Sequence, residues 1–543
     1  MNKVADSQRV RFIYIYIYIL FVILYAFGIV YNSSVPVMAG DDIAFYTALK
    51  KGEQVWHGLN FSLSRFFPLA GWNLNLVALF SISPYAFMIG NACVFVISAW
   101  AFWRIAVLFG ASAKWIALAA MAFFLSAGYT HIVTSICYPE LTQIMFLLLF
   151  VLMAFWYYKS KKIVWFVLAL IFGNACIYMK EVAFILIGGF GFFHLFFALW
   201  NEKFRFKMLD KKIVLFDVLC MLSGILFLGL YAYFAMSGGD YRNIVPYFSI
   251  SHTIFISIFG TPILSILFMF MLLFRFYRIF KYKEKYNPIV DSVGMIALAY
   301  WVGYMVLGMA SFHYFSPANI LAFLYVLFCS HFYSKELNFL FARVVLYVSV
   351  GILLSSAILQ GVNAFTTYKT QNKNTNDAFM FLADYIRKSP TKVNLYFDGF
   401  CRGYDRCIGA LFHQGAVFSI LPRYYDVNDN YDIKSKEPNG TEFSIDSSSP
   451  FTFFNSDEVS EPQSGDIVIL HYASSKYMTP SDVRDIVSQY EVLFVSNNYP
   501  YYPMYNLMSL GAFVLKSLGV STSFANRGNV FKLPSQVYVL RVP

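Results

Sequence analysis

Long apolar runs separated by short clusters of basic residues fill the first two-thirds of the chain. Their lengths are those of membrane-spanning helices rather than of strands. Residues 163–200 form a run that would extend about 57 Å as one helix, so we divide it into two spans at Lys180-Glu181. The pattern then predicts about 11 transmembrane helices, over residues 12–31, 84–103, 115–129, 141–158, 163–200 (two spans), 213–236, 253–274, 293–310, 319–332 and 344–362.

The basic clusters all fall on one side of this arrangement. They follow the runs that end near residues 103, 158, 200, 274 and 332. Lys3, Arg9 and Arg11 precede the first run, so the positive-inside rule predicts a cytoplasmic N-terminus and cytoplasmic basic loops. The first run has no small-residue cleavage site and reads as a retained helix rather than a removed signal peptide.

Composition agrees with a polytopic α-helical membrane protein. The 543 residues are 59% hydrophobic, and the mean hydropathy is +0.58. Only 13% of the residues are charged, whereas about 25% of the residues in a soluble domain are charged. The net charge of +11 is concentrated in one set of loops. We therefore expect a lipid bilayer around the chain and no nucleic-acid partner.

Residues 363–543 have a different, polar pattern that predicts a soluble α/β domain after a membrane domain of residues 1–362. Cys401 and Cys407 lie in this second domain, where a disulfide and two free thiols are equally open. The expected strands are residues 393–397, 466–470, 492–495 and 537–542, the expected helices are 376–388 and 480–490, and residues 426–465 are expected to form a long loop.

Two adjacent carboxylates, Asp41 and Asp42, lie just beyond the end of the first predicted span. In so apolar a chain, an acidic pair at a membrane boundary suggests catalytic carboxylates. The alternative is that the two acids have no catalytic role. They would then simply lie in an external loop, which accommodates charged residues, or cap a helix that begins at Ile43. A divalent cation is possible here, although two carboxylates alone make a poor cation site.

Further ionisable residues fall on the same predicted face. Arg65 lies in the loop before the second span, Glu140 begins a span, and Lys180-Glu181 divides the long run. A charge deep in the membrane costs about 2.5–3.5 kcal/mol, so such residues need partners. Neighbours on a helix point about 100° apart, so Lys180 should pair elsewhere, with Glu140 or a bound phosphate. The alternatives are a structural salt bridge and, for Arg65, snorkelling to the interface.

Taken in order, these segments resemble motifs of the GT-C glycosyltransferases. That fold includes protein O-mannosyltransferases and the aminoarabinose transferase of lipid A, which take sugars from polyprenyl-phosphate carriers. The resemblance covers roughly residues 10 to 330. The matching segments are Asp41-Asp42, Arg65 to Leu69 followed by Ser83 to Phe87 and Asn91, Glu140, Tyr178 to Glu181, and Phe312 to Pro317.

The chain departs from the family pattern at three places. Phe66 and Phe67 separate Arg65 from the proline of an "R-P-L" passage, and Ile89 or a neighbour stands where a histidine is expected. His313 takes the place of the arginine in an "R-Y-x-x-P" loop. The second domain resembles no family that we can name.

The resemblance implies an inverting transfer from a polyprenyl-phosphate-linked sugar donor. A carboxylate takes the proton from the acceptor hydroxyl, and cations hold the leaving phosphate. It favours Asp41 as the base, with Asp42 in support. The residues expected to bind the phosphate or the sugar are Arg65, Glu140, Lys180, Glu181, Arg242, His313 and Tyr314.

The resemblance also implies an acceptor outside the cytoplasm. We expect a surface glycan such as O-antigen or lipopolysaccharide ahead of a protein or lipid A, and a bacterial inner membrane with the second domain in the periplasm. Two other functions stay open. A lipid-linked sugar transporter would also use intramembrane charges, and a non-catalytic envelope assembly protein would keep its function in Asp41→Asn.

Overall fold

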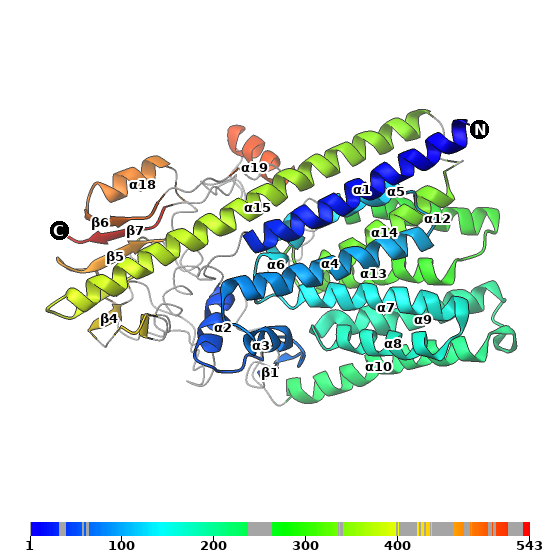
Figure 1. Ribbon diagram of the computed structural model, residues 1–543, viewed down its shortest axis with the longest axis horizontal. Coiled ribbons are helices and arrows are strands. Elements are labelled where there is room, and N and C mark those ends of the chain that lie inside the picture. The colour runs from blue at the N-terminus through cyan, green and yellow to red at the C-terminus, as the bar shows by residue number, and fades with distance from the viewer. Residues whose placement is uncertain are drawn as a thin grey trace.

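In the computed structural model, the helices of the first two-thirds run roughly along the long axis, and a small sheet lies at the end opposite the N-terminus (Figure 1). The structure describes residues 2–31, 40–56, 59–60, 65–236, 263–309, 311–334, 336, 340–397, 400, 421–422, 425–427, 430–434, 436, 460–471, 478, 480–497, 502, 507–519 and 536–543. Arg242, Cys401 and Cys407 lie outside these residues, and so do the side chains of Asp41 and Arg65.

The helical part contains long helices joined by short irregular segments. The helices are α1 (Asn2–Tyr31), α2 (Gly40–Lys50), α3 (Trp72–Ala78), α4 (Pro84–Leu108), α5 (Ala113–Phe124), α6 (Ala127–Val133), α7 (Glu140–Ser160), α8 (Ile163–Ile177), α9 (Phe184–Asn201), α10 (Lys211–Met236), α12 (Met269–Tyr282), α13 (Pro288–Val306), α14 (Ser316–Phe332) and α15 (Leu340–Lys388). Shorter elements are η2 (Glu181–Ala183), η3 (Phe206–Met208), η5 (Ile263–Phe268) and the hairpin of β1 (Leu59–Asn60) and β2 (Arg65–Phe66).

Among the described residues, 7 helices are long and apolar enough to cross a membrane, or 8 if α5 and α6 form one bent span. The polytopic helical class is therefore confirmed. The apolar helices α8 and α14 are shorter. Part of the expected span 253–274 lies outside the described residues.

The long run 163–200 is divided where its charged pair predicts. Helix α8 ends at Ile177. Lys180 directly precedes η2, one turn of 3₁₀ helix, and α9 then begins at Phe184. Lys180 has an extended backbone, with φ −161° and ψ 142°. The break removes Lys180 and Glu181 from a continuous apolar helix and leaves their side chains at the same end of the helices as Glu140.

Two elements differ from the expected boundaries. Residues 115–129 are not one straight helix, because Ser126 caps α6 and the axes of α5 and α6 meet at 67°. The last span and the helix expected over 376–388 are one continuous helix, α15. Residues 363–375 contain neither proline nor glycine, so nothing local ends the helix there. The boundary that we predict at residue 362 falls inside it.

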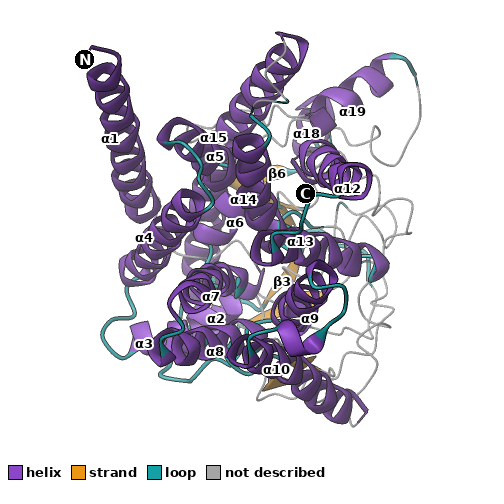
Figure 2. Ribbon diagram, turned by 90° about the vertical axis from the view of Figure 1, so that its right-hand side faces the viewer, coloured by secondary structure: helices purple, strands orange, loops and turns teal. Residues whose placement is uncertain are grey.

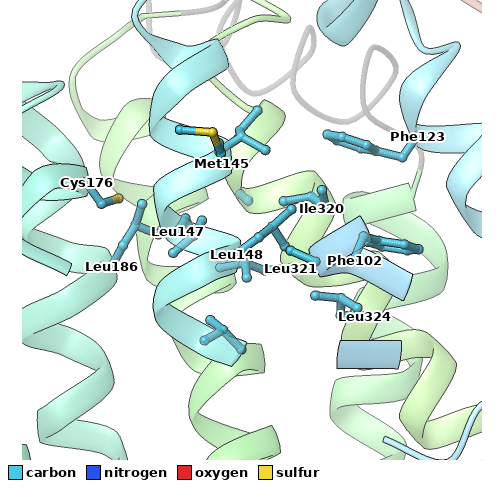
Figure 3. Close-up of a cluster of buried hydrophobic side chains, with 14 of the residues drawn as sticks. Phe102, Phe123, Met145, Leu147, Leu148, Cys176, Leu186, Ile320, Leu321 and Leu324 are labelled. Atoms are coloured by element: carbon cyan, nitrogen blue, oxygen red, sulfur yellow. The ribbon is translucent and has the colours of Figure 1, made fainter. Parts of the chain in front are cut away.

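Helix α7 is the centre of the helical part. It packs against α8, α4 and α14 and lies among the other helices in the view along their axes (Figure 2). Its side chains Leu147 and Leu148 lie between Leu186 on one side and Phe102 and Leu321 on the other (Figure 3). These side chains are fully or almost fully buried. The core therefore fixes α7, whose first residue is Glu140.

The second domain is a mixed five-stranded sheet of order β4-β3-β5-β7-β6. Strands β4, β3 and β5 are parallel, and β7 is antiparallel to both β5 and β6. The strands are β3 (Val393–Tyr396), β4 (Tyr431–Lys434), β5 (Ile467–Leu470), β6 (Glu491–Val495) and β7 (Tyr538–Arg541), with helices α18 (Pro480–Val487) and α19 (Leu507–Ser517). The expected α/β class and four expected strands are confirmed, whereas β4 lies in the expected loop. The end of α15 packs on this sheet through Phe379, Leu382 and Ile386.

A buried hydrogen-bonded cluster joins three helices at the end of α7 that is far from Glu140. Asp217 of α10 is fully buried. It accepts a hydrogen bond from the Tyr158 hydroxyl of α7 at 2.5 Å, and its other oxygen lies 2.8 Å from Nδ1 of His194 on α9. The Tyr158 and His194 rings stack with centroids 4.1 Å apart. Asp217 therefore satisfies buried polar groups on two neighbouring helices.

We expect Asp217→Ala to destabilise the protein by about 3–5 kcal/mol, because it leaves buried polar groups on α7 and α9 without their acceptor. The matched control is Asp384→Ala, since the Asp384 side chain is 56% exposed and 2.6 Å from Lys388. A surface pair of this kind contributes about 0–1 kcal/mol. Thermal unfolding of both purified variants measures the difference. Equal unfolding temperatures would show that the cluster does not stabilise the bundle.

Candidate active site

Asp42 is fully buried and holds the segment that leads from α6 to α7. Its carboxylate accepts hydrogen bonds from the Ser135 hydroxyl at 2.7 and 2.8 Å. It also accepts from the backbone N–H groups of Ile136 at 3.0 Å and Cys137 at 2.7 Å. Three donors on consecutive residues thus share one carboxylate, an arrangement that favours its ionised form.

Asn91 of α4 holds the same segment from another side. Its Nδ2 donates to the carbonyl of Val133 at 3.0 Å and to that of Ser135 at 2.8 Å. The Asn91 side chain is 4% exposed. Asp42 thus satisfies two backbone N–H groups of this non-helical segment, and Asn91 satisfies two carbonyls. The position of Glu140, a few residues further on, is therefore fixed.

Glu140 and Lys180 form a buried ion pair. Glu140 is the first residue of α7 and is 0% exposed, and Lys180, just before η2, is 6% exposed. Lys180 Nζ lies 3.1 Å from Glu140 Oε1. Among the described residues, Glu140 Oε2 has no hydrogen-bond partner. The helix N-terminus also favours a carboxylate here, and the pairing expected from the sequence is confirmed.

Aromatic rings surround the Lys180 ammonium. Nζ lies 5.3 Å from the centroid of the Phe67 ring and 5.1 Å from that of Tyr314. Leu69 N–H donates to the carbonyl of Tyr178 at 3.1 Å, so the loop that carries Phe67 is attached beside Lys180. These distances are within the range of cation–π attraction. Phe67 is one of the two residues that interrupt the family's motif, and here it lines the site.

His313 extends the same group of side chains. Its ring lies 4.6 Å from Tyr138 and 5.9 Å from His131, and its Nδ1 is 2.7 Å from the Ser311 hydroxyl. Burial, together with the nearby His131 and Lys180, holds the pKa of His313 well below its ordinary value of 6.5. The imidazole is therefore neutral at pH 7 and provides hydrogen bonds rather than charge.

The structure brings together Glu140, Lys180, His313 and Tyr314, which come from three separate parts of the sequence. Glu181, next to Lys180, is partly buried at the start of η2. The backbone of Asp41 lies in the first turn of α2 and that of Arg65 in β2, but their side chains are outside the described residues. We define the boundary site as Glu140, Lys180, Tyr314, His313 and Phe67.

Sequence reasoning missed some residues next to the boundary site. His131 Nε2 lies 2.8 Å from the Tyr138 hydroxyl, and Ser135 binds Asp42. Both belong to the polar segment 131–140 that separates two apolar runs, but no spacing rule selects them from that segment. Within the described part of the chain, no group of three His, Cys, Asp or Glu side chains could hold a metal ion.

No family model matches the chain, and no curated protein matches its sequence. Among solved structures, the chain is similar to ArnT from Cupriavidus metallidurans in the apo state, with a TM-score of 0.44, 11% identity and coverage of 89% of this chain and 96% of that one. It is also similar to ArnT bound to undecaprenyl phosphate, with a TM-score of 0.44, 12% identity and the same coverage. The chain is also similar to the Archaeoglobus fulgidus oligosaccharyltransferase in the apo form, with a TM-score of 0.38, 12% identity and coverage of 73% of this chain and 64% of that one.

Proposed function

We propose that the chain is an integral-membrane glycosyltransferase. It moves a sugar from a polyprenyl-phosphate carrier to an acceptor outside the cytoplasm. The observation that carries the proposal is the buried Lys180, held between Glu140, Phe67 and Tyr314 where the apolar helices begin. A carrier lipid cannot leave the bilayer, so its phosphate must be met by a cation at this depth.

The proposed transfer inverts the anomeric carbon. The acceptor hydroxyl oxygen forms a bond to that carbon while the carbon–oxygen bond to the phosphate breaks, and the bonding electrons leave with the polyprenyl phosphate. Asp41 takes the proton of the acceptor hydroxyl. The hydrogen bonds that occupy the Asp42 carboxylate support a positioning role for Asp42 and the role of base for Asp41.

Lys180 is proposed to hold the negative charge of the leaving phosphate. Its partner Glu140 orients the ammonium, and Oε2, which has no hydrogen-bond partner within the described part of the chain, offers an acceptor for a sugar hydroxyl. Tyr314 and the neutral His313 offer an aromatic wall and hydrogen bonds. The further proposed contacts to the phosphate or sugar are Arg65, Glu181 and Arg242.

The proposed topology has about 11 spans with the boundary site on the face away from the basic loops. Glu140 and Lys159 lie near opposite ends of α7, whose 21 residues extend about 31 Å, close to the thickness of the hydrocarbon core. The basic end is assigned to the cytoplasm by the positive-inside rule. The second domain and the boundary site then face the periplasm of a bacterial inner membrane, with O-antigen or lipopolysaccharide as the first acceptor to test.

The test uses the purified protein in lipid nanodiscs with a panel of polyprenyl-phosphate sugars and cell-envelope glycan. We expect one donor to release free polyprenyl phosphate, with its sugar transferred to the glycan, and no comparable release without the acceptor. Parallel reactions with EDTA test for a required divalent cation. If donor crosses the bilayer of proteoliposomes but is never cleaved, the transporter function replaces the proposal. If the donor is neither cleaved nor transported, the result favours an assembly protein.

A further inference from the structure

Helix α19 of the second domain exposes an apolar face. Leu510, Phe513 and Val514 are 48%, 50% and 52% exposed, and Leu518, just after the helix, is 72% exposed. Their spacing of three, four and eight residues places them on one side of the helix. Ser517, on the same side, donates its hydroxyl to the carbonyl of Phe513 at 2.8 Å and so presents no free donor there.

The segment before α19 is attached to α15 where that helix changes from apolar to polar. The Tyr502 N–H donates to the Thr366 hydroxyl at 3.2 Å, and the Tyr502 carbonyl accepts from the Asn363 amide. Asn363 directly follows the last apolar run, which ends at Val362. Helix α19 begins five residues after Tyr502 and, along the long axis of the molecule, lies at the level where α1 ends (Figure 1).

The end of α1 marks the same level independently. Lys369 of α15 donates from Nζ to the carbonyl of Tyr31, the last residue of α1, at 3.2 Å. The ammonium also lies 4.0 Å from the centroid of the Tyr31 ring. Asn363 and Lys369 are separated by about 9 Å of helix, comparable with the depth of one interfacial region of a bilayer. Tyrosine and lysine are typical of that region.

We propose that α19 is an interfacial helix that lies on the bilayer surface next to the second domain. In α15, Ile358 and Leu359 lie about one turn before Asn363 and are 41% and 44% exposed, as expected of side chains that meet lipid just inside this level. Leu510, Phe513 and Val514 enter the boundary between headgroups and acyl chains, while the exposed Lys516 on another side of the helix meets headgroup phosphate or water. The second domain is thereby held to the membrane by α19 as well as by α15.

The test places a nitroxide spin label on the full-length protein in nanodiscs of phosphatidylcholine and phosphatidylglycerol. The labelled variants are Phe513→Cys and Val514→Cys, with Lys516→Cys as the matched control on another side of α19. The signal of the parent protein, which carries the native cysteines, is subtracted. We expect labels at 513 and 514 to gain collisions with oxygen and to lose collisions with a water-soluble nickel chelate, relative to the label at 516.

Equal access of the nickel chelate to all three positions would overturn the proposal. Exclusion of both reagents from 513 and 514, with spin–spin broadening between labels, would instead assign this face to a second copy of the chain. The three side chains are exposed, so the variants should unfold at the temperature of the parent. The readout does not depend on sugar transfer, and the result is therefore separate from the proposed activity.

Discussion

Asp41→Asn should nearly abolish sugar transfer, whereas Asp42→Asn should lower the stability of the protein. A positioned general base contributes about 10²–10⁴-fold to the rate, and an amide cannot replace it. Asp42 instead accepts from Ser135, Ile136 and Cys137. The amide that Asp42→Asn introduces would turn one acceptor into a donor and leave buried donors unpaired, at about 1–3 kcal/mol.

The measurement pairs turnover at saturating donor with thermal unfolding for both variants and the wild type. Asp42→Glu is an additional control, since it keeps the charge but displaces the carboxylate from three fixed donors. We expect it to be destabilised as well. If Asp42→Asn lost turnover at an unchanged unfolding temperature while Asp41→Asn stayed active, the two roles would be exchanged.

The helical part was predictable because the bilayer constrains it strongly. A run of apolar residues has no alternative to a helix, and basic clusters mark where runs end. The single Lys180-Glu181 pair was enough to divide residues 163–200, since a charged pair in mid-membrane requires either a partner or a break. The structure contains both, the η2 turn and the contact with Glu140.

Elements that depend on tertiary contacts were not predictable in the same way. The change from apolar to polar residues at 363 predicts a domain boundary, yet α15 continues through residues 363–375 and packs its end on the sheet. Strand β4 has one buried side chain, Ile433, and its pairing with β3 rather than its own pattern makes it a strand. The bend between α5 and α6 depends on the cap at Ser126, which could equally continue a helix.

In the candidate site, too, some features could be predicted from the sequence and others depend on tertiary contacts. Residue type and sidedness were enough to select Glu140 and Lys180, and the resemblance to an "R-Y-x-x-P" loop added His313. The sequence could not say which acid of the Asp41-Asp42 pair is buried, because the donors that hold Asp42 lie more than 90 residues away along the chain. Nor could it assign the charge state of His313, which follows from burial beside His131 and Lys180.

The Glu140–Lys180 pair allows stability and activity to be separated. Lys180→Met alone should destabilise the protein by about 3–5 kcal/mol, because it leaves the buried Glu140 carboxylate without a counter-charge. The double variant Glu140→Gln/Lys180→Met removes both charges of this pair. It should therefore recover most of the stability, since neutral residues of similar size often replace a buried pair without loss.

The double variant should nevertheless fail to transfer sugar. Without the Lys180 ammonium, the charge that develops on the leaving phosphate has lost a fixed cation, and removing one such group typically lowers kcat by about 10²–10³-fold. Thermal unfolding, donor affinity and kcat are measured for the wild type, both single variants and the double variant. A double variant that is stable and still active would make the pair purely structural, and the phosphate contact would then belong to Arg65 or another residue. A stable variant that binds donor but does not turn it over would place Lys180 in the chemical step, since its loss would then affect the transition state more than the bound donor.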